Sequence, residues 1–192
     1  MSARDAKADL HGYLRMIREA VLWKLDGVSE YDARRPMTPT GTNRLGVVTH
    51  RACVHIGYFG WTFDRGREIE LPWYADDADP NADMWATEDE SREQILTLYQ
   101  QACDLGDATV TDLDLDAEGH VPWWPAERNP VTLHLILIHV IAETNRHAGQ
   151  MDIVRELIDG AAGLRAANTN LPDGTDWPAH HARVNAAATR FR

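Results

Sequence analysis

The sequence is short of the features that would anchor or cross-link it. Its 192 residues include only two cysteines, Cys53 and Cys103, which lie far apart and match no zinc-finger or redox spacing. No apolar run approaches the roughly 20 residues of a membrane span. The first ten residues are charged, unlike the apolar core of a secretory signal. These absences predict a cytoplasmic protein with reduced thiols and no membrane segment.

Basic residues are also few. Nineteen Lys and Arg stand against 30 Asp and Glu, which gives a formal net charge of −11. Because the basic residues are scattered along the chain and do not form a cluster, the negatively charged surface should repel the phosphate backbone of a nucleic acid. We therefore expect no nucleic-acid partner.

The chain does contain helical periodicity, with apolar residues at three- and four-residue spacing in four segments. These segments run from about Asp5 to Leu25, from Thr42 or Asn43 to about Phe63, from Thr87 towards Leu113, and from near Val131 to Ile158, and a short basic helix is predicted over 178–191. Two connections, over residues 66–87 and 114–130, exceed ordinary bundle turns. The pattern predicts an all-α protein: a four-helix bundle with long crossover connections, forming a single domain over residues 1–192 with a short C-terminal extension from about residue 163.

Tryptophan is abundant for a chain of this size, with seven residues. Five of them fall in predicted connections or at helix edges: Trp73, Trp85, Trp123, Trp124 and Trp177. A large ring outside a regular helix packs over a core as a lid or lines a pocket. Lid packing is the more common of these roles, and the sequence does not separate them.

The last predicted bundle helix carries His139, Glu143 and His147 at successive four-residue steps. Each step turns the helix by about 400°, so neighbours in the series lie within roughly 40° of each other and one turn apart. Glu143 and His147 can therefore reach one metal ion, as paired histidines do in helical zinc motifs. On an exposed helix the same pair would be a minor surface ion pair. Here the apolar residues 138–142 place Glu143 near the core, where a carboxylate without a cation is costly.

A further ligand has to come from another helix, and the second predicted helix offers His50 and His55. They are separated by about 500° of helical rotation, so both cannot face one point. His55 lies nearer the apolar stripe of that helix. His50 lies on a face of small residues that would let a neighbouring helix approach closely; these are Gly46, Cys53 and Gly57. The spacing leaves both histidines open as ligands.

Several motifs resemble the DinB-like metalloprotein superfamily. Residues 39–50, PTGTNRLGVVTH, look like the entry to its second helix, and residues 133–158, LHLILIHVIAETNRHAGQMDIVRELI, are similar to its last bundle helix. More closely, the chain resembles the actinobacterial branch related to mycothiol-dependent enzymes, in the motifs LPW at 71–73, NADMW at 81–85 and VPWWP at 121–125. The resemblance covers about residues 9–172.

The resemblance implies a metal held by His50, Glu143 and His147. Many relatives carry a third histidine where this chain has Glu143, whereas the mycothiol-linked isomerases resemble it in using glutamate. The resemblance also makes His139 and Gln150 candidates for groups that orient the ligands or contact substrate. His55 replaces an acidic residue expected in close relatives.

Other residues are candidates with weaker support. The connections that carry Trp123 and Trp124 are expected to shape the pocket, and Arg146, adjacent to His147, is a candidate pocket residue. Arg128 and Arg155 could bind an acidic cosubstrate, although exposed arginines mostly solvate a surface. We expect Cys53 to be a buried packing residue rather than a nucleophile. Surface positions without chemistry are expected for His134, His180 and His181.

Two imidazoles and one carboxylate suit one divalent ion, with zinc or nickel the metals we expect. Three protein ligands leave coordination positions open, which is typical of a catalytic site. A thiol bound there would lose its proton, which suits a thiol transferase, although the residues alone do not separate this from other uses of an open metal site. The resemblance implies a thiol S-transferase acting on a small electrophile, with a low-molecular-weight thiol of the mycothiol type as cosubstrate. The alternatives are a hydrolase that uses metal-bound water and a non-catalytic, stress-associated metal-binding dimer. The resemblance also implies a homodimer, which apolar outer parts of the second and fourth helices would permit.

Overall fold

The computed structural model describes residues 5–169 and 171–192. The helices are α1 (Ala6–Trp23), α2 (Glu30–Arg34), α3 (Arg44–His55), α4 (Arg92–Asp112), α5 (Leu133–Asp159) and α6 (Trp177–Thr189). A π-helical turn, Ile56–Gly60, and four short 3-10 turns, Trp61–Phe63, Pro72–Tyr74, Ala82–Met84 and Ala126–Arg128, complete the helical elements. The expected all-α class is confirmed. None of the helices in the described ranges is long and apolar enough to cross a membrane.

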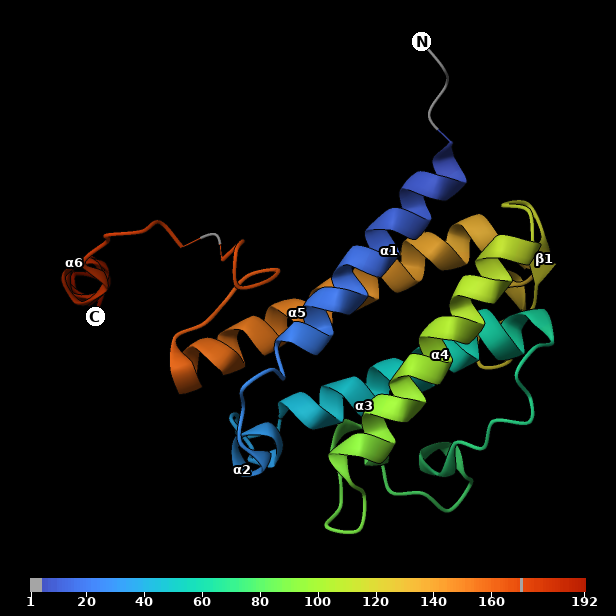
Figure 1. Ribbon diagram of the computed structural model, residues 1–192, viewed down its shortest axis with the longest axis horizontal. Helices are drawn as coiled ribbons and strands as arrows, with labels where there is room; N and C mark the ends of the chain where they lie inside the picture. The colour runs from blue at the N-terminus through green and yellow to red at the C-terminus, as the bar shows by residue number, and fades with distance from the viewer. Residues whose placement is uncertain (1–4, 170) are drawn as a thin grey trace.

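Four long helices form the body of the fold, with α1 packed along α5 and α3 along α4 (Figure 1). α3 also contacts α5, and α1 contacts α4. The core between them is filled by buried apolar side chains from all four helices: Leu14, Ile17, Val21, Leu45, Val48, Ala52, Ile95, Tyr99, Ala102, Ile136, Leu137 and Val140. The site described below therefore rests on rigid, well-packed elements.

α3 is buried on almost every side, since His50 is its one residue that is not buried. The predicted helix to about Phe63 is continuous, but it changes type after His55, first to a π turn and then to a 3-10 turn that ends at Asp64 in the left-handed conformation. A π turn accommodates one more residue per turn than the α-helix and is common at functional sites. The side chains that follow the π turn are therefore rotated from the positions that α-helical spacing would give them.

α4 begins later than predicted. The acidic residues after Thr87 favoured a helix start there, but the helix starts at Arg92 because Ser91 and Gln94 form a capping box. Glu90 instead folds the preceding link, where its carboxylate accepts hydrogen bonds from the Thr87 amide at 2.6 Å and the Trp73 indole at 2.8 Å. The acids before Ser91 thus serve the connection rather than the helix dipole.

The connections contain elements that periodicity did not predict. α2 lies between α1 and α3, and a two-residue antiparallel pair joins β1 (Glu118–Gly119) to β2 (Val131–Thr132) just before α5. The predicted basic helix near the C-terminus is present as α6. It stands apart from the four long helices (Figure 1), and all of its residues are exposed.

The outer face of α5 carries exposed apolar side chains. In its first half, Leu135 and Ile138 are each 44% exposed. Further along the same helix, Ile153 and Leu157 are also exposed. The expected apolar outer surface therefore exists on α5 but not on α3. The homodimer remains a prediction.

Candidate metal centre

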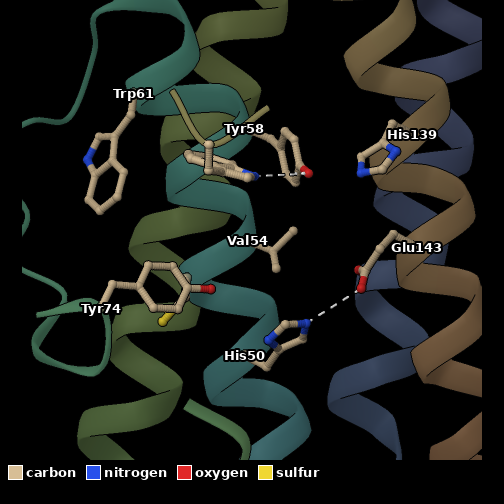
Figure 2. A pocket seen from close by; sticks show the side chains of 9 residues that line it. His50, Val54, Tyr58, Trp61, Tyr74, His139 and Glu143 are labelled. Carbon is tan, nitrogen blue, oxygen red and sulfur yellow. Dashed lines mark hydrogen bonds and ion pairs between the residues drawn. The ribbon is translucent and has the colours of Figure 1, made fainter. Parts of the chain in front are cut away.

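His50 on α3 and the pair Glu143 and His147 on α5 converge between the two helices. Oε1 of Glu143 lies 2.7 Å from Nε2 of His147 and 3.5 Å from Nε2 of His50. One ligand atom from each of the three side chains lies within 4.8 Å of the others. Figure 2 shows His50 and Glu143 facing each other across the gap between their helices. The three residues carried over from the resemblance are thus close enough to share one ion.

Hydrogen bonds orient both imidazoles. Nδ1 of His50 donates to Oδ2 of Asp83 at 2.6 Å, and Nδ1 of His147 donates to Oε1 of Gln150 at 2.7 Å. When Nδ1 of a neutral imidazole donates, Nε2 carries the lone pair. Metal-binding histidines are oriented in this way by a carboxylate or carbonyl partner. Both Nε2 atoms face Glu143.

This arrangement fits a cation. Burial, together with the charges of His50 and Arg51, lowers the pKa of His147 to about 4, so its ring is neutral at neutral pH. When both rings are neutral and donate through Nδ1, the two Nε2 lone pairs and a carboxylate oxygen point at one another, and electron pairs at such distances repel each other. A divalent ion with nitrogen and oxygen preferences would replace that repulsion with three coordinate bonds. The donor set therefore suits the metal that the resemblance implies.

Asp83 reaches His50 because the link between α3 and α4 closes over Gly46. A Cβ atom on Gly46 would overlap the backbone carbonyl of Met84. Burial alone would raise the pKa of Asp83, but hydrogen bonds from His50 and from the Tyr74 hydroxyl outweigh it, so the pKa is lowered and the carboxyl is ionised. The small-residue face was expected to admit a neighbouring helix, and that was wrong. A 3-10 turn of the link lies against Gly46, and the ring of Trp123 lies against Gly57.

The other oxygen of Glu143 is held by the protein itself. Arg51, fully buried, forms an ion pair with Oε2 of Glu143 and donates to the Thr144 hydroxyl at 2.7 Å. The expectation that this carboxylate needs an external cation to offset its burial is therefore wrong, because Arg51 supplies one. The case for a metal rests on Oε1 and the two histidines.

His55 is fully buried and lies away from this cluster. Its Nδ1 donates to the Arg51 carbonyl at 2.7 Å, and its Nε2 accepts from Nε of Arg18 at 2.9 Å. Burial, reinforced by the charges of Arg18 and Arg51, lowers the pKa of His55 well below its ordinary value. Both ring nitrogens of His55 already have hydrogen-bond partners. His55, the alternative to His50 as a ligand, is therefore not available to a metal.

A cavity of about 540 Å³ opens beside His50 and Glu143 (Figure 2). Most of its wall is apolar or aromatic, formed by Cys53, Val54, Tyr58, Trp61, Tyr74 and Trp123, with His139 at one end. This size and lining are typical of a pocket for a small organic molecule. Burial raises the pKa of the Cys53 thiol well above its ordinary value, so Cys53 lines the cavity as a neutral packing residue, as expected.

The remaining candidates lie at different distances from the cluster. His139 lines the cavity, and its ring packs against Tyr58 at 4.7 Å between centroids. Burial, with help from the charges of Arg128 and Arg51, lowers the pKa of His139. Trp123 lines the cavity, whereas Trp124 packs against His139 at 5.2 Å. Of the two indoles, only Trp123 belongs to the cavity wall.

The predicted arginines and surface histidines lie outside the cavity wall. Arg146 is exposed on α5, and Arg128 stacks on the Trp124 ring at 3.9 Å. Arg155 caps the end of α1 by donating to the carbonyls of Trp23 and Asp26. The exposed positions expected for three histidines are found at His134, His180 and His181. The arginine hypothesis for an acidic cosubstrate therefore finds no support in the cavity.

Four residues of the site were missed at the sequence level: Arg51, Tyr58, Tyr74 and Asp83. Arg51 follows His50 directly, and a charged residue inside an otherwise apolar helix could have marked a buried ion pair. Asp83 and Tyr74 come from an irregular link, where periodicity gives no orientation. Tyr58 lies in the π turn, which the sequence did not indicate.

Comparison with known proteins agrees with the resemblance. A family model described as mycothiol-S-transferase matches residues 9–160. No curated protein matches the chain. Among solved structures, the crystal structure of a conserved protein from Enterococcus faecalis superposes with a TM-score of 0.60 at 16% sequence identity, covering 82% of this chain and 99% of that one. At that identity the likeness concerns the fold alone.

Proposed function

Because this chain belongs to the mycothiol-S-transferase family, we propose that it is a metal-dependent transferase that joins mycothiol, or a similar low-molecular-weight thiol, to a small electrophile. The observation that carries the proposal is the meeting of His50, Glu143 and His147 at the edge of an apolar cavity. Family membership supplies the reaction class, and the cavity supplies the space for a second reactant.

In this proposal His50, Glu143 and His147 hold one divalent ion, with zinc or nickel preferred. A bound ion of this kind would lower the pKa of a thiol so that it reacts as thiolate at neutral pH. Asp83 and Gln150 keep the two imidazoles turned towards the ion. Arg51 fixes one oxygen of Glu143, which leaves the other oxygen for the metal.

The cavity wall would serve the electrophile. Its aromatic and aliphatic side chains give a low-polarity surface in which a small organic molecule can lie beside the thiol. Holding both reactants in one site raises their effective concentration, which is a major source of rate enhancement in two-substrate reactions. Cys53 takes no part as a nucleophile, because its thiol stays protonated.

The test begins with metal content. We expect purified wild-type protein to contain about one zinc or nickel per chain, and His147→Ala to lose most of it. His134→Ala is the matched control, because His134 is an exposed histidine on the same helix. Unchanged metal content in His147→Ala would refute the proposed ligand set.

The second measurement is conjugation of mycothiol to a chromogenic aryl halide. The rate should fall to background with a chelator and return when metal is added back. Cleavage of a chromogenic ester without thiol, if it depended on metal while conjugation did not, would favour the hydrolase. Metal binding with neither activity would favour the non-catalytic metal-binding dimer.

A further inference from the structure

The Tyr58 hydroxyl is an unusual polar group in the wall of the cavity. Tyr58 lies in the π turn that continues α3, and it is only 7% exposed. Its oxygen accepts hydrogen bonds from two indoles, Nε1 of Trp124 at 3.1 Å and Nε1 of Trp123 at 3.4 Å. Indole nitrogen can only donate, so in both bonds the tyrosine is the acceptor.

The two indole N–H groups occupy the hydrogen-bond acceptor positions of the Tyr58 oxygen. The hydroxyl proton of Tyr58 is then its remaining hydrogen-bonding group. In the part of the chain that the structure describes, no group accepts a hydrogen bond from the Tyr58 hydroxyl. A buried hydroxyl proton without an acceptor loses a hydrogen bond that water would otherwise provide. Tyr58 is therefore prepared to donate to a molecule inside the cavity and poorly suited to accept from one.

Other residues hold this arrangement in place. Gly57 allows the close approach of Trp123, because a Cβ atom on Gly57 would lie 2.7 Å from Cη2 of that ring. Arg128 packs on the ring of the second indole donor, Trp124. Both tryptophans come from the link between α4 and α5, so that link sets the direction in which Tyr58 donates.

Tyr58 lies at the end of the cavity away from the metal ligands. It follows His50 by two helical turns, which corresponds to roughly 12 Å along a helix, and Figure 2 shows it opposite His139, beyond Val54. The hydroxyl of the other lining tyrosine, Tyr74, already donates to Asp83. The rest of the wall near Tyr58 is apolar or aromatic.

We propose that Tyr58 is a specificity-determining residue, which donates a hydrogen bond to an oxygen acceptor on an otherwise apolar, ring-sized ligand. In the context of the proposed function, on which this reading of the ligand rests, the ligand is the electrophile. It would carry a carbonyl or similar oxygen at the end opposite the carbon that meets the thiol. Electrophiles whose remote polar group is a donor would gain nothing from Tyr58, because the two indoles already donate to its oxygen.

The test compares three bicyclic probes of similar shape: 1-indanone, which only accepts, indole, which only donates, and indane, which does neither. Dissociation constants are measured by ligand-observed NMR with wild-type protein, both metal-loaded and treated with chelator. We expect wild type to bind 1-indanone about fivefold more tightly than indane. Tyr58 should contribute nothing to the affinity for indole, because the two indole side chains already donate to its oxygen.

Two variants separate a hydrogen-bonding role from a merely structural one. Tyr58→Phe should lose about fivefold in affinity for 1-indanone and nothing for indane. Trp124→Phe keeps a ring for Arg128 but removes one indole donor, which frees one acceptor position on the Tyr58 oxygen, so this variant should gain affinity for indole. Near-ultraviolet circular dichroism confirms that each variant is folded.

Three outcomes would overturn the proposal: equal losses for 1-indanone and indane in Tyr58→Phe, no loss for 1-indanone, or a loss of affinity for indole in Tyr58→Phe as large as the loss for 1-indanone. Probe selectivity in a protein whose metal-loaded form shows no transferase activity would leave the role of Tyr58 intact and refute only the proposed function. Conversely, conjugation without probe selectivity would refute only the role of Tyr58.

Discussion

Asp83 offers the most direct test of how the candidate metal centre is built. Asp83→Ala removes the acceptor that holds Nδ1 of His50 at 2.6 Å, while the three ligands stay in the chain. A hydrogen bond to a charged group contributes about 1.5–3 kcal/mol, and 1.4 kcal/mol corresponds to tenfold in affinity. We therefore expect zinc affinity to fall by about 10- to 100-fold, the range seen when such orienting groups are removed from metal sites.

Two further variants should show smaller losses of zinc affinity. Asp83→Asn keeps a neutral acceptor for His50 and should lose less affinity than Asp83→Ala. Tyr74→Phe removes a hydrogen bond, 3.1 Å long, from the Tyr74 hydroxyl to the same carboxylate oxygen. It should cost less zinc affinity than Asp83→Ala, because the carboxylate and its hydrogen bond with His50 remain.

The assay is competition for zinc with a chromophoric chelator, supported by the visible spectrum of the cobalt-substituted protein. Loss of affinity with a changed cobalt spectrum would indicate that the geometry at His50 has relaxed. If Asp83→Ala bound zinc as tightly as wild type with the same spectrum, the idea that the link orients His50 would be refuted.

Two other predictions concern stability. Gly46→Ala should lower the free energy of unfolding by about 1–3 kcal/mol, because the Met84 carbonyl must move away from the new methyl group; Gly149→Ala, at an open helical position, should be neutral or stabilising in the same urea titration. His55 is neutral when folded, with the guanidinium groups of Arg18 and Arg51 and the ring of Tyr99 around it. Its folded pKa lies well below 6.5, so only the unfolded chain takes up a proton as the pH falls below about 6.5, and this residue should cost up to about 1.4 kcal/mol of stability per pH unit in that window. In the presence of chelator, wild type should therefore lose more stability than His55→Gln between pH 7 and pH 5.5, and parallel losses would contradict this account.

The sequence identified the helices and the α5 part of the site better than the α3 part. Helical spacing placed Glu143 and His147 one turn apart on one face, and no tertiary information was needed. It could not choose between His50 and His55, because α3 is buried on nearly all sides and an apolar stripe does not point to one partner. The choice is made by contacts from other segments, namely Arg18 for His55 and Asp83 for His50.

The resemblance indicated Gln150 as a group that orients a ligand, and it does contact His147, whereas Asp83 was beyond reach for a related reason. Asp83 approaches His50 through an irregular link that crosses Gly46, and no periodicity relates residues so far apart in sequence. Arg51 was overlooked because the charge of Glu143 was assigned to a metal alone. The start of α4 was misplaced because a local capping box outweighs a general preference for acids near a helix start.

Two kinds of segment share the cavity, and apart from Asp83, which orients His50, the connections can change without the ligands. The three candidate ligands belong to long packed helices, whereas Tyr74 and Trp123 reach the cavity from the irregular connections before and after α4. Such connections tolerate exchange and insertion far better than a helical core does. Diversification among relatives should therefore be concentrated in these two connections, which would alter the range of accepted molecules while the chemistry at the ligands is inherited unchanged.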